Sequence, residues 1–172
     1  MITALVITAL SGYGLYVVGS EAGVGGFAFV LTTTLVSFGG AFFVGDKLRQ
    51  ALPDSLFHVS DRMNRIVKAL GVDHFNRFLH FIRWNRVALS LRPPLGTRRP
   101  PEELLASVRS NAVAHTWGAA VHLVASSIAA LASLPAALWI FGLGLLLHVY
   151  PVLLQVRTHW RLQRLQELSR SR

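Results

Sequence analysis

Histidines in two apolar runs of this sequence are spaced so that they could support chemistry. The first run carries a stripe of small and polar residues, namely His115, Ala119, His122 and Ser126. The second carries a stripe made of Gly144, His148, Pro151, Gln155 and His159. Spacings of three and four residues place each stripe on one face of a helix. Small and polar residues let membrane helices approach closely and hydrogen-bond to each other, so we expect both stripes to point into a bundle.

Depth within the runs indicates which histidines could act together. His115 lies about one turn from the end of its run, and His148 lies about two turns from the matching end of the next. A positioned imidazole takes up and releases protons near neutral pH, so these two are candidate catalytic residues. His122 lies deeper, and we expect a structural role for it. Two alternatives stay open: neutral histidines that only bond a neighbouring carbonyl or hydroxyl, and a pair that binds haem or a chlorin.

Other kinds of site find no support in the sequence. It has no cysteine, which excludes disulfides, thiolate metal sites and a cysteine nucleophile. The motifs HExxH and GxSxG and the Walker phosphate-binding loop are absent. The glycine-rich GVGG at 23–26 has no basic residue near it and is interpreted as a tight turn. We predict no metal site.

Four long apolar runs must position the histidines. The chain of 172 residues is 52% hydrophobic with a mean hydropathy of +0.47, too apolar for an ordinary soluble domain. Each run is near the roughly 20 residues that a helix needs to cross a bilayer. The first lacks the basic start of a signal peptide, so we interpret it as a retained span. We predict an all-α integral membrane protein, a single membrane domain over 1–172, whose two hairpins have spans at about 2–18, 27–45, 111–132 and 136–156.

The distribution of charge predicts the topology. All 17 Lys and Arg residues fall in two blocks, Lys47–Arg109 and Arg157–Arg172, and the turns at 19–26 and 133–135 contain none. The positive-inside rule then places the segment 46–110 and both termini in the cytoplasm, in a multi-pass protein of the inner (cytoplasmic) membrane. The net charge of +9 is explained by that basic face and not by nucleic acid. Arginines of the basic C-terminal helix 157–172, Arg157 included, are expected to contact anionic lipid.

The cytoplasmic segment 46–110 is predicted to contain helices that lie on the membrane surface. Ser60 is a candidate N-cap and Gly71 a candidate C′ residue of a short helix. The following stretch, DHFNRFLHFIRWNR (73–86), has apolar residues on one face, as is typical of a helix in the headgroup layer. The proline-rich LRPPLGTRRPP (91–101) predicts an extended connector, whose last prolines open a helix that continues into the third span.

The stretch HVYPVLLQVRTHWRLQRLQ (148–166) resembles the C-terminal signature of the glycosyl-4,4'-diaponeurosporenoate acyltransferase family. The residues that match in register are Tyr150, Pro151, Gln155, Arg161 and Leu162. EELLASVRSNAVAHTW (102–117) is similar to the family's Glu-containing helix that leads to a histidine, here His115, and LGVDHFNRFLHFIRWNR (70–86) is similar to its interfacial helix. The resemblance covers about residues 60–170. Members of the family are small membrane proteins that esterify the sugar of a glycosylated carotenoid with a fatty acyl chain.

The resemblance implies acyl transfer to a hydroxyl of a glycosylated carotenoid or similar lipid, with acyl-coenzyme A or another activated acyl group as the donor. His115 would be the general base, and His148 would orient the substrate or stabilise the oxyanion. The implied substrate-binding residues are Tyr150, Gln155, Arg157 and Arg161, the two arginines holding an anionic donor. Membrane lipids and a carotenoid or other pigment are the implied partners.

Two departures from the family pattern support an alternative. His148 stands where the family has Asn, and Asn111 and Ala112 occupy positions near which the family has a Glu before its histidine. A chain that kept the fold without the activity would be a non-catalytic accessory subunit of a larger membrane complex, for example a photosynthetic or respiratory one. Stripes of small residues and a basic cytoplasmic face would serve that role equally well.

Overall fold

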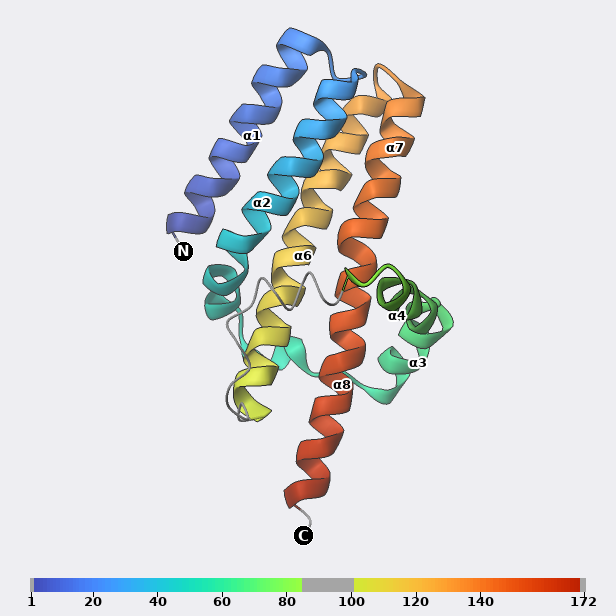
Figure 1. Cartoon of the computed structure of the whole chain (residues 1–172). Coiled ribbons are helices and arrows are strands. Elements are labelled where there is room, and N and C mark those ends of the chain that lie inside the picture. The colour runs from blue at the N-terminus through green and yellow to red at the C-terminus, as the bar shows by residue number, and fades with distance from the viewer. Residues whose placement is uncertain (1, 85–100, 171–172) are drawn as a thin grey trace. The chain divides into compact units, whose positions relative to one another are not determined.

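Helices make up the secondary structure of the described chain. The computed structural model describes residues 2–84 and 101–170 (Figure 1), and within these ranges no strand occurs, which confirms the all-α prediction for them. The chain divides into two compact units, residues 1–56 with 110–152 and residues 57–109 with 153–172. The single domain over 1–172 stays a prediction, because each unit is assembled from two separate stretches of the same chain.

The first unit is a bundle of long helices. Its helices are α1 (Ile2–Ala22), α2 (Phe27–Ala51), the part of α6 (Pro101–Ala130) that begins at Ser110, and α7 (Leu134–Gly144). They lie side by side in Figure 1. The turn between α1 and α2 uses Gly23 at φ +78°, a conformation that a residue without a Cβ adopts readily. The start of α7 is capped by Ser133, whose side chain accepts a hydrogen bond from the backbone of Ala136.

A π-helical turn, Leu145–Val149, follows α7 and leads into α8 (Tyr150–Arg170). Pro151 accounts for the irregularity, because proline has no N–H to donate to the carbonyl of Leu147 four residues earlier. The turn contains His148. Pro151 therefore alters the backbone beside this histidine.

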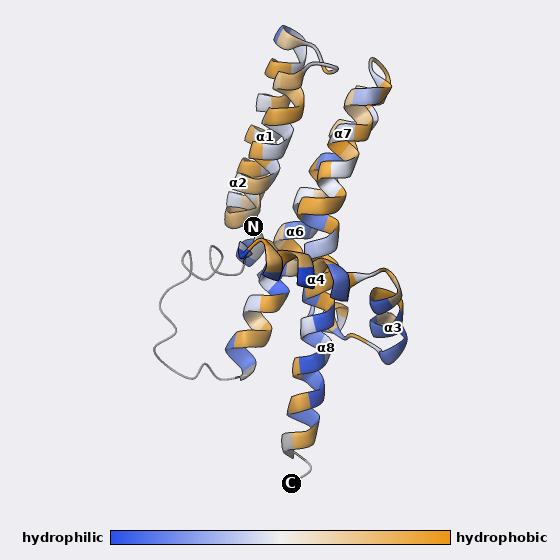
Figure 2. Cartoon of the chain, turned by 45° about the vertical axis from the view of Figure 1, so that its right-hand side comes forward, coloured by the Kyte–Doolittle hydropathy of each residue, from blue (hydrophilic) through white to orange (hydrophobic). Residues whose placement is uncertain are grey.

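Four helical stretches are long and apolar enough to cross a membrane by length and composition: Ile2–Ala22, Phe27–Ala51, Glu102–Ala130 and Leu134–Leu168. They contain the predicted spans 2–18, 27–45 and 136–156 and extend beyond them, whereas the third stretch begins before the predicted span 111–132 and ends two residues short of it, at Ala130. Figure 2 shows hydrophobic residues, drawn in orange, recurring along α1, α2 and α7. On α1 the large apolar side chains are exposed, and Ala4 is the buried residue. Such a helix is apolar on its outer surface, as a helix in lipid must be.

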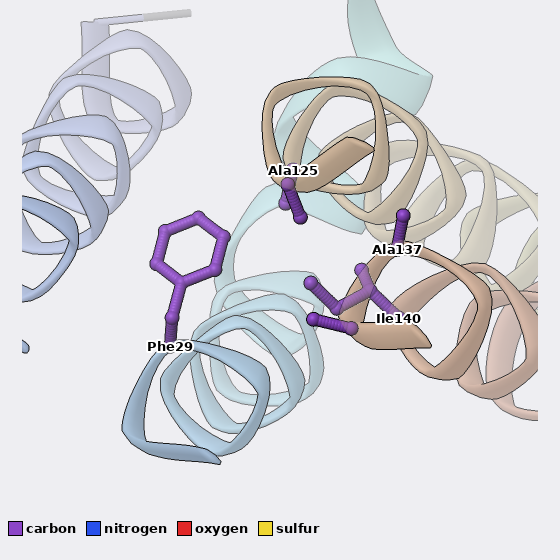
Figure 3. Packing of buried hydrophobic residues seen from close by; sticks show 6 residues of the cluster. Phe29, Ala125, Ala137 and Ile140 are labelled. Atoms are coloured by element: carbon purple, nitrogen blue, oxygen red, sulfur yellow. The ribbon is translucent and has the colours of Figure 1, made fainter. Parts of the chain in front are cut away.

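Small residues form the centre of the bundle (Figure 3). The cluster combines Phe29 of α2 and Ile140 of α7 with the alanines Ala125, Ala129, Ala136 and Ala137 of α6 and α7. Alanine on both facing helices lets their backbones approach closely, which is how helices pack where no hydrophobic force drives them together. The hydroxyl of Ser126 donates to the carbonyl of Ala137 at 2.9 Å, so the same contact also includes a hydrogen bond between the two helices.

The second unit contains the short helices α3 (Asp61–Ala69) and α4 (Val72–Phe81) and the part of α8 from Leu153. Ser60 caps α3 by accepting a hydrogen bond from the N–H of Met63, and Gly71 follows it in the left-handed conformation, so both predicted helix ends are confirmed. Phe78 and Phe81 of α4 are exposed, as the surface-helix prediction requires. Most of the predicted connector 91–101 lies outside the described residues, and α6 begins at Pro101.

Candidate functional site

His115 and His148 meet inside the first unit. His115 comes from α6 and His148 from the π-helical turn, and their Nδ1 atoms are 3.4 Å apart. The ring centroids are separated by 5.5 Å. His148 is fully buried, whereas His115 is partly exposed. The prediction that the two imidazoles point into the bundle and reach each other is confirmed, and their catalytic role stays a prediction.

A serine on α2, which the sequence did not identify, completes this contact. The Nε2 of His148 lies 3.1 Å from the hydroxyl of Ser37, which is itself fully buried. The Ser37 hydroxyl is also 3.0 Å from the carbonyl oxygen of Thr34. The sequence does contain a pattern that includes Ser37, because Thr33, Ser37 and Ala41 are small residues spaced four apart, and all three are buried on one face of α2. This pattern does not indicate which residue of another helix faces Ser37.

His122 joins the same group. Its ring centroid is 5.0 Å from that of His148, and its side chain is only 1% exposed. Its Nδ1 lies 3.2 Å from the carbonyl of Gly118, and its Nε2 is buried without a hydrogen-bond partner in the part of the chain that the structure describes. The bond to a carbonyl of its own helix is the structural arrangement expected for this histidine, although the ring lies closer to the His115–His148 pair than its depth suggested.

Gly118 and Gly144 make room for the histidine rings of the facing helix, Gly118 for His148 and Gly144 for His122. The segments GAAVH (118–122) and GLLLH (144–148) carry the same Gly-to-His spacing on facing helices. A Cβ at Gly118 would overlap the ring of His148, and a Cβ at Gly144 would lie 2.6 Å from the Cβ of His122. Each histidine therefore packs against the glycine that precedes the other. The repeated spacing is visible in the sequence, but it acquires a meaning only when the two helices are paired.

The backbone next to Pro151 gives His115 a further partner. The carbonyl of Leu147, to which Pro151 cannot donate, is hydrogen-bonded by the ring of His115. Membrane helices tolerate proline where a neighbouring helix satisfies the freed backbone group in this way. The proline and the histidine pair thus belong to one local arrangement.

The predicted substrate-binding residues are divided between the units. Tyr150 belongs to the first, whereas Gln155, Arg157 and Arg161 belong to the second. Arg161 is exposed, as a residue that binds an anion must be. The expectation that Arg157 contacts lipid headgroups is wrong, because its side chain is buried.

The buried Arg157 forms part of the interior of the second unit. Its Nη1 donates to Oδ1 of Asn64 at 2.6 Å, and its Nε lies 3.5 Å from Oδ1 of Asp73. It therefore ties α8 to both short helices. A second interior contact joins Nε of Arg109, which donates, to Nε2 of His159 at 3.2 Å.

A polar hollow of about 290 Å³ lies at the start of α3, and its wall includes Asp61, Trp160 and Arg164. The indole N–H of Trp160 donates to Asp61 at 2.8 Å, and Arg164 donates to both oxygens of the same carboxylate at 2.8 and 2.6 Å. These hydrogen bonds, that of Trp160 first, hold the pKa of Asp61 below its usual value. The carboxylate remains charged and accepts from two α8 side chains.

These features define the class of protein: a helical bundle with four helices apolar enough to span a membrane and a buried histidine cluster beside a π-helical turn. Comparisons of the chain with protein-family models, with curated proteins and with solved structures give no match. Among the described residues, no group of three or more His, Asp or Glu side chains is arranged to hold a metal ion.

Proposed function

We propose that this chain is a membrane acyltransferase that transfers a fatty acyl group from an activated donor to a hydroxyl of a glycosylated carotenoid or a similar lipid. The observation that carries the proposal is the contact between His115 and His148, with Nδ1 atoms 3.4 Å apart. A histidine whose ring is held by a second group is the arrangement that general-base catalysis of acyl transfer needs. The similarity of residues 148–166 to the acyltransferase signature supplies the substrate class.

The proposed reaction uses His115 as the base. The acceptor hydroxyl gives its proton to His115 while its oxygen attacks the carbonyl carbon of the acyl thioester. The tetrahedral intermediate then expels the thiolate, which takes the proton back from His115. The products are an ester and a free thiol, and the histidine is regenerated. Because no acyl-enzyme is formed, a chain without cysteine can perform both steps.

The proposed setting is the inner (cytoplasmic) membrane, with four spans and both termini in the cytoplasm. The support is the placement of Lys and Arg in two blocks that fall on one side under this topology. The absence of native cysteine makes a labelling test clean. A cysteine replacing the exposed Glu21 should react with an impermeant maleimide in intact cells, and one replacing the exposed Arg62 only after permeabilisation. Labelling of the Arg62→Cys variant in intact cells would contradict the topology.

Acyl transfer is tested in membranes that contain the chain, with a glycosylated carotenoid or glycolipid as the acceptor and a labelled acyl-coenzyme A as the donor. His115→Ala should lower kcat by about 10²- to 10⁴-fold, the usual contribution of a positioned general base. His80→Ala, which removes an exposed histidine of the second unit, is the matched control and should retain activity. Unchanged turnover in the His115→Ala variant would exclude this mechanism.

One observation favours the alternative function, an accessory subunit of a larger membrane complex. A hollow of about 520 Å³ on α7 is mostly apolar, and it is lined by Leu134, Pro135, Leu138, Trp139 and Gly142. Such a surface fits a helix of another membrane protein. Purification in a mild detergent separates the two functions: a stoichiometric polypeptide partner together with no acyl transfer would support the subunit, and transfer by the isolated chain would support the enzyme.

A further inference from the structure

We infer that Ser37 sets the direction of a hydrogen-bond chain that leaves Nε2 of His115 without a proton, so that Ser37 and His148 are positioning residues for the base. The inference rests on the proposed function for its meaning, because it states which nitrogen of His115 takes the proton. Its geometry does not depend on that function. The series of hydrogen bonds runs from Ser37 on α2 through His148 in the π-helical turn to His115 on α6.

The direction originates at a backbone carbonyl. The oxygen of Thr34 can only accept a hydrogen bond, so the single hydroxyl hydrogen of Ser37 points to it over 3.0 Å. The hydroxyl oxygen of Ser37 is then left with lone pairs toward His148. The contact of 3.1 Å between that oxygen and Nε2 of His148 is a hydrogen bond only if His148 carries its proton on Nε2.

The same reasoning passes to His115. A neutral imidazole has one N–H, so a proton on Nε2 of His148 leaves its Nδ1 as an acceptor. The contact of 3.4 Å between the two Nδ1 atoms then needs the proton of His115 on Nδ1. With that proton on Nδ1, Nε2 of His115 is the bare nitrogen. The ring of His115 also bonds the carbonyl of Leu147, another pure acceptor, and this tautomer requires the Nδ1–H to be shared between Leu147 and His148.

His122 is held in its own orientation and does not interrupt the chain. Its Nδ1–H donates to the carbonyl of Gly118 at 3.2 Å, which leaves its Nε2 as an acceptor. The partners that face the pair are thus a hydroxyl, a carbonyl and a third neutral imidazole. Neutral partners suit an apolar bundle, because a buried carboxylate in the orienting position would carry a large cost of desolvation.

The test measures tautomers directly by ¹⁵N NMR of the histidine rings. The full chain, with labelled histidine, is placed in lipid bilayers at about pH 8, where unperturbed imidazole is neutral. The expected wild-type result is a proton on Nδ1 of His115, on Nε2 of His148 and on Nδ1 of His122. Signals are assigned with single His→Gln variants. A wild-type spectrum with the His148 proton on Nδ1 would overturn the inference, and this measurement needs no variant of Ser37 to fold.

Variants of α2 test the cause. Ser37→Ala should redistribute the tautomers of His148 and His115, whereas Ser37→Thr, which keeps a hydroxyl, should restore them. Thr33→Ala is the matched control, because it removes another fully buried hydroxyl, which donates to the carbonyl of Phe29 in the same helix and bonds no histidine among the described residues. Unchanged tautomers in Ser37→Ala would refute the role of Ser37.

The kinetic readout separates this inference from the proposed function. Loss of one net hydrogen bond predicts a roughly three- to tenfold lower kcat in Ser37→Ala with KM unchanged. The predicted tautomers together with no acyl transfer in wild type would support the hydrogen-bond chain and refute the proposed acyltransferase activity. Acyl transfer that depends on His115, together with tautomers opposite to those expected, would support the acyltransferase activity and refute the hydrogen-bond chain.

Discussion

The reciprocal packing of glycine and histidine predicts a sharp difference between neighbouring glycines of one helix. Gly142 and Gly144 both lie on α7, but a Cβ at Gly142 would meet no atom of the described residues within 4 Å, whereas a Cβ at Gly144 would lie 2.6 Å from the Cβ of His122. Both contacting atoms are attached directly to the backbone, so rotation of a side chain cannot relieve the overlap. The two helices would have to separate by about 0.8 Å to reach the 3.4 Å of ordinary contact.

The expected free energies follow from this contrast. Replacing glycine by alanine in a helix interior stabilises by about 0.5–1 kcal/mol through backbone entropy, and Gly142→Ala should show this gain. Overpacking in a filled core costs about 1–3 kcal/mol. The net for Gly144→Ala is therefore a destabilisation of up to about 2.5 kcal/mol, and Gly118→Ala, whose Cβ would overlap the ring of His148, should be destabilised as much or more.

Reversible unfolding of the chain in mixed micelles, followed by circular dichroism, measures the difference between these variants. Gly142→Ala provides the baseline, because it makes the same chemical change on the same helix. The double variant Gly144→Ala with His122→Gly removes the Cβ that overlaps, and it should lose less stability relative to His122→Gly than Gly144→Ala loses relative to wild type. A Gly144→Ala variant as stable as Gly142→Ala would refute the close approach of α6 and α7 at this point.

Three further predictions concern the second unit. Because the pKa of Asp61 is lower in the folded state, its contribution to stability is present above its unfolded pKa and is lost as the pH falls through the lower folded pKa. The NMR signal of the Trp160 indole N–H should therefore stay unchanged from neutral pH to about pH 4 and shift below it. Asp61→Asn should abolish that transition. Arg157→Ala should destabilise this unit by about 2 kcal/mol in a protease-susceptibility assay, and the exposed Arg161→Ala should not; equal stability of the two variants would contradict the buried role of Arg157. A spin label at Phe81→Cys should be relaxed by oxygen and not by an aqueous nickel complex if α4 lies in the headgroup layer, and the reverse result would remove that placement.

Much of the architecture follows from local properties of the sequence. Runs of about 20 apolar residues favour helices that can span a bilayer, and four such helices are present. The helices extend beyond the predicted spans because hydropathy marks the apolar part alone, while backbone hydrogen bonding continues through polar residues such as Lys47 and Arg49 at the end of α2. Ser60 and Gly71 mark the ends of α3 by capping, which depends on a few adjacent residues.

The candidate site was predictable in part for the same reason. The spacing of His115 and His148 placed each on an inward face, and their depth brought them to a similar level, so their contact could be anticipated. Ser37 lies 111 residues from His148 along the chain, and no local pattern couples the two. Their contact depends on the rotation of α2 about its own axis, which the packing of all the surrounding helices determines.

By itself, the sequence determined the number of apolar helices and the capping of α3. It also determined which faces of α6, α7 and α8 point inward. All of these features depend on residues within one or two helical turns of each other. Tertiary structure alone decided that each of two glycines receives a histidine from the facing helix, and that Arg157 is buried against Asn64 instead of meeting lipid. The physical reason is that these contacts join segments from different helices. Their formation depends on distances of a few tenths of an ångström between backbones, which no periodicity in one segment encodes.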